Sequence, residues 1–515
     1  MKSLSNWIIQ IYLFLMLGVF PLYYQDGYYN MGDAKYEFFK YATIVMLGVL
    51  AVVRSYEKVA KRESWKLQLS RQDTTVLLYT AAAILSFVMS PYRENAWIGS
   101  YEWYMGLLAQ LLFIGVYFAV SRKSEKNLWN LGILSMSGAL VFLISYLHRF
   151  RIDPLGLYEG IAEIYWLSFL GTIGNANWYS SYICVILPLL IGVYVFFEKP
   201  QSVLGKIAHV LSGAVLLLGI ATTVTQNSDS AYAGLALSFM FILWFAMEKP
   251  KYLIRFLEVL LLGLSATKIT GYLQVTFPEY AIKVSGISTT ITQGKVTVYL
   301  LVTVFLIYLV MRFFEKKYIG YWSMIRKLRN VFYVMLAIGM LAIPVIMWCI
   351  SKGIFVLNEG LLSQTGYLVF NDRWGSNRGV IWKYAIQTFK EYPMSMKLFG
   401  CGPDALMWYS GEFHQTEVQA VWGNTILTNV HNEWLNMLIN YGVFGAITYI
   451  SIFITCIVRT VKNWKEKPIL LAFGAAVIAY MGHNFFCFQQ VVCTSLIFIV
   501  IAMAEGDIVK LKKDR

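Results

Sequence analysis

The chain has 515 residues, of which 58% are hydrophobic and only 14% are charged. Soluble proteins carry about a quarter charged residues, so this composition excludes an ordinary soluble domain and favours an integral membrane protein. The net charge of +14 does not indicate a nucleic-acid partner, because the basic residues are scattered over separate segments and do not line one face. The six cysteines form no CxxC pair, so neither a disulfide framework nor a zinc site is predicted.

Apolar stretches long enough to cross a bilayer recur along the whole chain. A membrane-crossing helix needs about 20 mostly apolar residues. On this basis we predict an all-α, polytopic membrane helix bundle with about fourteen transmembrane helices. Their expected ranges are 7–24, 38–53, 74–90, 105–121, 128–147, 177–197, 207–226, 231–247, 253–267, 296–313, 332–350, 434–458, 469–482 and 491–505.

The charges between these spans predict how the bundle is oriented. If the loops alternate between the two sides and the N-terminus is inside, 29 of the 43 Lys and Arg residues fall on the inner side. Basic residues in short loops mark the cytoplasmic side, so we expect both termini in the cytoplasm. The excess positive charge then reflects topology and attraction to anionic lipid headgroups.

One connection, 351–433, is much longer than the others. Long connections in compact proteins are usually functional or disordered. This one is rich in Trp, Tyr and Phe, so we expect it to fold over the outer end of the bundle. The predicted organisation is therefore helices 1–11 over 1–350, an extracytoplasmic loop over 351–433, and helices 12–14 with a basic tail over 434–515.

The first half of this loop carries a helical pattern. Ser376 and Asn377 can cap a helix that opens with Arg378, and apolar residues then recur on one face until Pro393 ends the helix. A tight glycine-rich turn follows. The loop begins and ends at the membrane, so we expect Arg378 and His431 to meet there although they lie far apart in the sequence.

Arg378 and His431 are the main candidates for chemistry. The planar guanidinium of Arg378 suits bidentate binding of a phosphate, although an arginine that pairs with Asp372 or a lipid phosphate is the alternative. His431 can serve as a general base near neutral pH, and the alternative is a structural role at the start of the next helix. Arg373 is a second, weaker candidate for phosphate binding.

Polar residues beside the predicted helix ends have mainly structural interpretations. We expect Asn432 and Glu433 to cap the span that begins near Trp434. A second His-Asn pair, His483-Asn484, is interpreted as mostly structural because no charged residue accompanies it in the sequence.

Two further outer segments contain groups that could contact a sugar. One carries Asn175 and Asn177 just before a span, and the other carries Asp229 between two spans. Ordinary capped turns are the alternative for both. No Walker-type loop and no His, Asp and Glu cluster at metal spacing occurs in the sequence, so we predict neither a cofactor nor a metal.

Several motifs follow one another through the loop and the span after it. They are the Arg378-x-x-x-Trp382 helix, Pro393 followed by the Gly400-Cys401-Gly402-Pro403 turn, the His431-Asn432 pair, and the glycines Gly442 and Gly445, together with the earlier segment 171–187 and its Gly-x-x-Asn-x-Asn pattern. With these motifs, residues 375–450 resemble the O-antigen ligase/polymerase family of polytopic bacterial membrane proteins. Many members have a Ser-Arg pair where this chain has Ser228-Asp229, so another group, with Arg373 as the candidate, would take the place of that arginine.

The resemblance implies a metal-independent, inverting glycosyltransferase with a GT-C-like fold in the bacterial cytoplasmic membrane. Its donor would be a glycan on undecaprenyl diphosphate, its acceptor a glycan or glycolipid, and its partners the lipid bilayer and polysaccharide-assembly proteins. Arg378 would stabilise the leaving diphosphate and His431 would take the acceptor proton. The implied substrate-binding residues are Arg373, Asn432, Gly402, Asn175, Asn177 and Asp229.

Other functions remain open at this point. A polymerase and a ligase are not distinguished by the sequence. A lipid-linked oligosaccharide flippase or transporter is the alternative from another class, and it would favour charged groups inside the spans and no long folded outer loop. A non-catalytic scaffold would make Arg378 and His431 replaceable.

Overall fold

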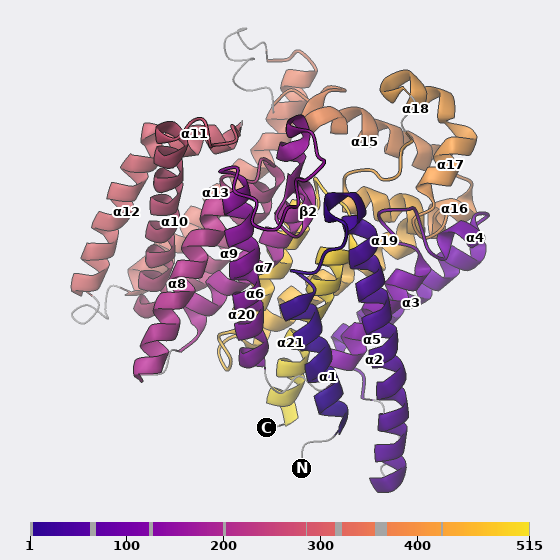
Figure 1. Cartoon of the computed structure of the whole chain (residues 1–515), viewed down its shortest axis with the longest axis horizontal. Helices are drawn as coiled ribbons and strands as arrows, with labels where there is room; N and C mark the ends of the chain where they lie inside the picture. Colours follow the sequence, from indigo (N-terminus) through magenta and orange to yellow (C-terminus); the bar gives the residue numbers. More distant parts are fainter. Residues whose placement is uncertain are drawn as a thin grey trace.

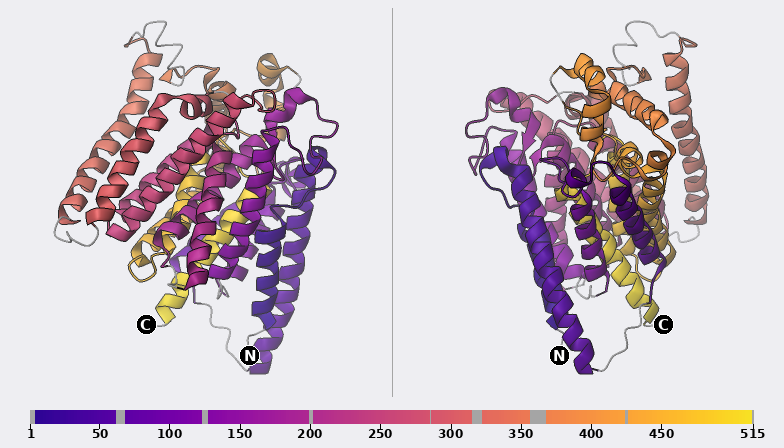
Figure 2. Two further views of the ribbon diagram at one scale, coloured as in Figure 1. Left: turned by 60° about the vertical axis from the view of Figure 1, so that its left-hand side comes forward. Right: turned by 90° about the vertical axis from the view of Figure 1, so that its right-hand side faces the viewer.

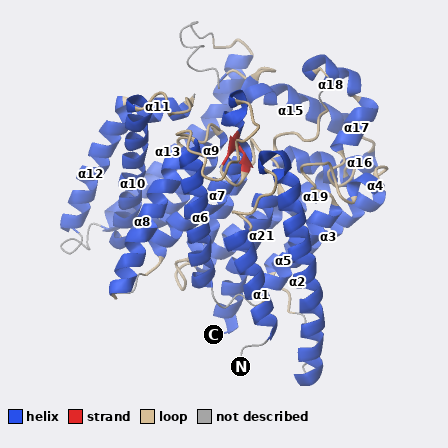
Figure 3. Ribbon diagram, viewed as in Figure 1, coloured by secondary structure: helices blue, strands red, loops and turns tan. Residues whose placement is uncertain are grey.

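The computed structural model is a helix bundle, with one pair of very short strands among the residues that the structure describes (Figure 1, Figure 3). Nine of the described helices are long and apolar enough to cross a membrane, and four shorter apolar helices accompany them. The prediction of an all-α polytopic membrane protein is confirmed. The described residues are 4–61, 68–122, 127–198, 202–284, 286–314, 322–355, 368–423 and 426–513.

Each of the fourteen predicted spans overlaps one helix of the bundle. The bundle helices are α1 (Leu4–Phe14) with its continuation η1 (Leu15–Val19), α2 (Met31–Lys61), α3 (Arg71–Met89), α5 (Leu107–Ser121), α6 (Asn127–His148), α7 (Ala176–Phe196), α8 (Val203–Thr223), α9 (Ser230–Ala246), α10 (Pro250–Thr276), α12 (Lys295–Phe314), α13 (Trp322–Ser351), α19 (Glu433–Asn463), α20 (Leu470–His483) and α21 (Val491–Lys513).

Shorter elements lie in the connections. They are η2 (Gly27–Asn30), α4 (Arg93–Ala96), η3 (Glu163–Ser168), β1 (Phe169–Leu170), β2 (Gly174–Asn175), α11 (Ile287–Gln293), α15 (Trp374–Glu391), α16 (Met394–Phe399), α17 (Leu406–Phe413) and α18 (Gln415–Trp422). Strands β1 and β2 pair antiparallel, with Phe169 opposite Asn175.

The helices differ strongly in how much protein surrounds them. In α7 and α21, 94% and 100% of the most apolar window is buried, whereas almost none of it is buried in α12 and α13. These two helices lie at the edge of the bundle in the left view of Figure 2. A helix that is apolar all round is surrounded by protein or by lipid, so α7 and α21 form the core and α12 and α13 are expected to face lipid.

The helices of the long loop lie at one end of the bundle. In Figures 1 and 2, α15 to α18 cover the end opposite to the one where α1 begins and α21 ends. Parts of the predicted loop, 356–367 and 424–425, lie outside the described residues. Apolar side chains of this loop form their own small core with α4 and α19, including Ile381, Tyr409 and Ile439.

A kink in α19 attaches the loop to the bundle. Gly442 has a left-handed φ of 65°, and the carbonyls of Ile439 and Asn440 bond outside the helix. They accept hydrogen bonds from the backbone N–H groups of Cys401 (3.1 Å) and Gly402 (3.0 Å). The glycine-rich turn is thereby fixed against the helix that follows His431.

Candidate active site

Arg378 lies in the first regular turn of α15, behind three left-handed residues. Gly375, Ser376 and Asn377 have φ values of 58°, 60° and 68°. Left-handed backbone is unfavourable for residues with a Cβ, so this entry is strained. The residue after Arg378 is a glycine, Gly379, and a Cβ at this position would lie only 1.9 Å from the Asn371 carbonyl oxygen. The backbone thus turns sharply and directs the start of α15 toward the bundle.

The Arg378 guanidinium is held by main-chain carbonyls. Its Nε and Nη2 donate to the Phe486 carbonyl (3.2 and 2.9 Å), and Nη1 donates to the Gly375 carbonyl (2.7 Å). No acidic side chain pairs with Arg378 within the described ranges. Burial lowers the pKa of Arg378 below its usual value. The site therefore contains a partly buried positive charge whose neighbours orient it without neutralising it.

Trp382 contacts the same residue as Arg378. Its ring stacks on that of Phe486, with centroids 6.2 Å apart and planes at 27°. Residues four positions apart lie on one face of a helix, so the Arg-x-x-x-Trp spacing brings both side chains onto Phe486. Trp374 also packs against Phe486 (6.1 Å). The Arg378-x-x-x-Trp382 motif therefore packs the start of α15 against the connection between α20 and α21.

His431 lies next to this charge. It has a left-handed φ of 49°, its backbone N–H donates to Asn429 Oδ1 (3.1 Å), and its ring meets Phe488 edge-on at 5.1 Å. Burial, and to a smaller extent the positive charge of Arg378, lower the pKa of His431 to about 4. The predicted approach of Arg378 and His431 is thus present, and His431 is neutral near pH 7.

The residues after His431 start α19 in different ways. Asn432 caps the helix, because its Oδ1 accepts from the N–H groups of Trp434 and Leu435 (both 3.1 Å). The prediction that Glu433 also caps the helix is wrong. Its buried carboxylate instead accepts from the hydroxyls of Tyr449 (2.7 Å) and Tyr480 (3.0 Å) inside the bundle.

The two His-Asn pairs meet in this site. Asn484 donates to Glu433 Oε2 (2.5 Å), and its carbonyl accepts from the Glu433 N–H (2.9 Å). His483 is fully buried and lies within electrostatic reach of Arg378. Charged neighbours from distant parts of the chain therefore do accompany His483-Asn484, whereas its mostly structural role stays a prediction.

Residues 281–450 match the O-antigen ligase family. The chain has an O-antigen ligase-like domain. The match spans about a third of the chain and includes both Arg378 and His431. No match was found among curated proteins. The family and the apolar helices together indicate a multi-pass protein of the bacterial inner membrane that acts in the ligation or polymerisation of cell-surface glycans.

The polar residues before α7 and α9 lie outside the ligase-like domain but border the same site. Asn175 caps α7 by accepting from the Asn177 N–H (2.8 Å), and Asn177 Oδ1 accepts from the Ser228 hydroxyl (2.9 Å). Backbone groups of Asn177 and Ser230 flank the His483 ring. The two predicted sugar-binding segments are therefore joined to each other and to the Arg378 neighbourhood.

Asp229 precedes the first residue of α9. Its side chain does not cap that helix, and its carboxylate lies beside Gly286, where an added Cβ would be 3.0 Å from Oδ2. Arg373 is exposed, and its backbone N–H donates to Asn371 Oδ1 (3.0 Å). Both residues remain predictions as substrate contacts.

Arg149 was missed in the sequence. It is 1% exposed and donates to the carbonyls of Thr225 (2.8 Å), Trp166 (2.8 Å), Leu167 (3.2 Å) and Gln226 (3.3 Å). Burial lowers its pKa. Arg149 ties the turn that contains Asp229 to the connection after α6. The available signal was two arginines directly after an apolar span on the predicted outer side.

Gly402 and Asp404 attach the glycine-rich turn of the ligase-like domain. The Gly402 N–H is bonded to the Asn440 carbonyl, and a Cβ at this position would lie 2.3 Å from Ser90 Oγ. This geometry favours a docking role over the predicted substrate contact. Asp404 Oδ2 accepts from the N–H groups of Ser100 (2.8 Å) and Met105 (3.2 Å), and burial raises its pKa to about 7.

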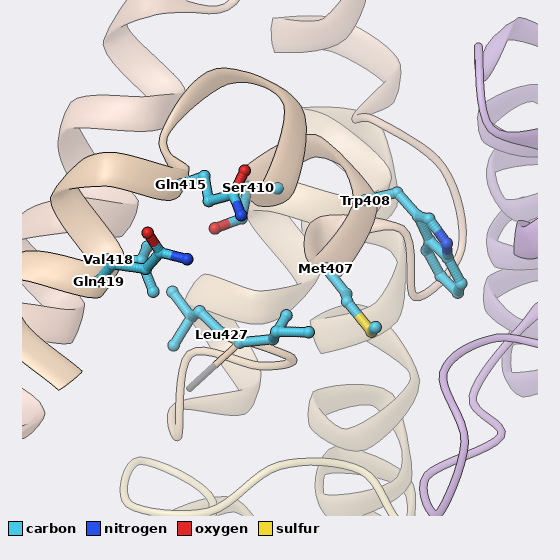
Figure 4. Close-up of a pocket in the computed structure, with 9 residues that line it drawn as sticks. Met407, Trp408, Ser410, Gln415, Val418, Gln419 and Leu427 are labelled. Carbon is cyan, nitrogen blue, oxygen red and sulfur yellow. The ribbon is translucent and has the colours of Figure 1, made fainter. Parts of the chain in front are cut away.

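A separate hollow of about 370 Å³ lies between α17, α18 and the segment after them (Figure 4). Its wall is mostly apolar, with polar groups from Ser410, Gln415 and Gln419, and no charged side chain is among its described lining residues. It can accept a small uncharged group. The lack of charge distinguishes it from the Arg378 site.

Proposed function

We propose that this protein transfers a glycan from undecaprenyl diphosphate to an acceptor hydroxyl at the outer face of the membrane. The observation that carries the proposal is the Arg378 guanidinium, which is held by carbonyls beside a neutral His431 and lacks an acidic partner in the described part of the chain. A buried charge is costly unless it is paired, so such a site favours an anionic ligand. The diphosphate supplies that anion, and the apolar bundle holds the polyprenyl chain.

Arg378 would stabilise the departing diphosphate. Arginine has five N–H donors, and the contacts to Phe486 and Gly375 leave donors on Nη1 and Nη2 for phosphate oxygens. When the bond between the anomeric carbon and the phosphate oxygen breaks, its electron pair stays with the diphosphate. A donor that is already oriented lowers this barrier without reorganisation, and the proposed reaction needs no metal.

His431 would act as the general base. Its neutral imidazole can take the proton of the acceptor hydroxyl as that oxygen attacks the anomeric carbon. Attack on the face opposite the diphosphate inverts the configuration. Because the positive charge of Arg378 lowers the pKa of His431, a bound diphosphate that offsets this charge would raise it. Donor binding would therefore make His431 a stronger base.

The remaining predicted residues are assigned to substrate binding in this proposal. Asn432 has its side-chain oxygen bonded to α19 and its amide nitrogen available for a sugar, and Asn177 and Asn175 border the site beside α7. Arg373, which is exposed, and Asp229 complete this set. The basic side of the bundle, with both termini, would face the cytoplasm, and polysaccharide-assembly proteins would be partners.

The experiment compares lipid-linked glycans in a deletion strain that carries each variant. Arg378→Ala and His431→Ala should each abolish transfer at unchanged membrane abundance. Lys383→Ala is the matched control, because Lys383 is exposed on the same helix and pairs with Asp372 (2.7 Å). Full transfer by both variants would contradict the proposal.

The accumulating intermediate assigns the reaction. Single lipid-linked repeats indicate a polymerase, and long chains retained on the lipid indicate a ligase. Intermediates trapped on the inner leaflet indicate a flippase and would overturn the proposed transfer.

A further inference from the structure

A basic cleft lies between α3, α19 and α21, at the end of the bundle where α21 ends. Its volume is about 670 Å³. All three helices contribute cations to its wall, and no acidic side chain is among its described lining residues. The cationic lining residues are Arg71, Arg459, Lys462 and Lys512.

Three of these four cations have no acidic partner among the described residues. Arg459 is paired with the buried carboxylate of Glu505 through two bonds, Nε to Oε2 (2.7 Å) and Nη2 to Oε1 (2.6 Å). For Arg71, Lys462 and Lys512, by contrast, the described residues supply no ion pair, and all three are exposed. The cleft therefore presents three uncompensated positive charges beside the paired Arg459.

A second cleft at the same end of the bundle has mixed charge, so the uncompensated positive charge is specific to the first cleft. It has a volume of about 340 Å³ and lies between α6, α7, α20 and α21. Its basic residues Lys467 and Lys510 are accompanied by Glu198, Glu466 and Asp507, and Lys467 pairs with Asp507 at 2.8 Å. Two clefts of the same membrane side thus differ in charge, and only the one beside α3 suits an anion.

Apolar surface extends from the basic cleft toward the middle of the bundle. Ile454 and Val458 lie two turns and one turn before Lys462 on the same face of α19, and both line the cleft. They are 48% and 42% exposed, and Leu69 on the opposite wall is 48% exposed. An inorganic anion would use only the cations, whereas a lipid would use the cations and this apolar strip.

We propose that this cleft binds the phosphate headgroup of an anionic phospholipid, with an acyl chain along Ile454 and Val458. Basic pockets between membrane helices are suited to such headgroups. The inference rests on the placement of the helices in a membrane and not on the proposed glycan transfer, so either can fail without the other.

The test measures lipid binding to the delipidated full-length protein by native mass spectrometry, with phosphatidylglycerol and phosphatidylcholine as probes. Phosphatidylglycerol should bind preferentially. Each basic residue near a charged headgroup is worth about fivefold in affinity, so Arg71→Gln/Lys462→Gln/Lys512→Gln should weaken phosphatidylglycerol binding roughly 100-fold. The matched control, Lys467→Gln/Lys510→Gln in the second cleft, should bind like the unchanged protein.

Two further variants separate charge from folding. Arg71→Lys/Lys462→Arg/Lys512→Arg preserves the charge and should keep the preference for phosphatidylglycerol. If the triple glutamine variant does not elute as a single folded species, Lys462→Gln alone, with an expected loss of about fivefold, decides the question.

Equal phosphatidylglycerol binding by the triple variant and the control would overturn the proposal. Inorganic phosphate is added as a competitor to the unchanged protein. If it displaces phosphatidylglycerol from the cleft, the cleft is a site for free anions, and the assignment to a lipid is overturned.

Discussion

Two arginines at opposite ends of the bundle are held in different ways. Arg378 is oriented by the carbonyls of Phe486 and Gly375, whereas Arg459 donates hydrogen bonds to both carboxylate oxygens of Glu505. A carboxylate neutralises a guanidinium and uses its paired donors, so Arg459 is part of the framework. Carbonyls orient the guanidinium but leave its charge and some donors free. The difference shows that the partner of a buried arginine, more than its burial, indicates whether it can receive an anion.

The largest expected effect separates the two arginines. Arg378→Ala should lower the transfer rate at least about 100-fold at unchanged thermal stability, because an electrostatic donor in the proposed transition state is lost. Arg459→Ala should leave Glu505 buried and unpaired, which costs about 3–5 kcal/mol of stability. Its transfer rate per folded molecule should be unchanged. A transfer assay and a thermal melt of both purified variants check this. A stability loss in Arg378→Ala with normal transfer, or a transfer loss in folded Arg459→Ala, would contradict the comparison.

The next prediction concerns the influence of Arg378 on His431. The pKa of His431 is lowered, so its neutral form is favoured in the folded protein. The base is therefore available above about pH 5, and activity at low donor concentration should fall only as the pH drops through about 4. Arg378→Gln should move the pKa of His431 upward. Histidine NMR titration measures both proteins, and identical titrations would show that the two residues are not coupled.

A smaller effect is expected from the kink in α19 that attaches the loop to the bundle. Gly442→Ala puts a Cβ at 2.4 Å from the Leu398 backbone and imposes left-handed strain of about 1–2 kcal/mol. The variant should melt earlier and its loop should be cleaved faster by protease. Gly411→Ala is the control, since a Cβ there meets no atom within 4 Å. Equal protease sensitivity of the two variants would argue against the docking role of the kink.

The smallest effect concerns Asp404. Burial raises its pKa from 3.8 to about 7, so the protonated form is favoured in the folded protein. Its contribution to stability is complete below 3.8 and is lost as the pH rises through about 7. Hydrogen exchange at Ser100 and Met105 should therefore increase above pH 7 beyond the intrinsic rate. Asp404→Asn, which stays neutral, should lack this extra increase; if it shows the same increase, another group is responsible.

Whether a feature could be predicted from the sequence depends on how far apart in the chain its interacting residues lie. The helix that carries Arg378 and Trp382 and the Asn432 cap could be predicted, because helical periodicity and capping depend on residues within one or two turns of the same element. Glu433 was misread as a cap because its partners, Tyr449 and Tyr480, lie deeper in the bundle. Charge and hydropathy carry no information about such partners.

The same reason explains the other differences. Arg149 was missed because its carbonyl partners lie 17 or more residues away, in its own connection and in the later turn before α9. His483-Asn484 looked isolated because Arg378 and Glu433 approach it only in the folded bundle. Gly402 was singled out in the sequence, but its hydrogen-bond partner was not. The backbone carbonyl of Asn440 is free to accept from Gly402 because the kink at Gly442 interrupts the helix.

The sequence by itself determined that this chain is a bundle of membrane-crossing helices with one long polar connection, because the length of an apolar run against the thickness of a bilayer is a local property. It also marked Arg378 and His431 by residue type. Only the tertiary structure decided that carbonyls hold Arg378 and that its charge reaches His431. These contacts join α15, the α20–α21 connection and the start of α19, and burial makes the charge matter by removing the water that would screen it.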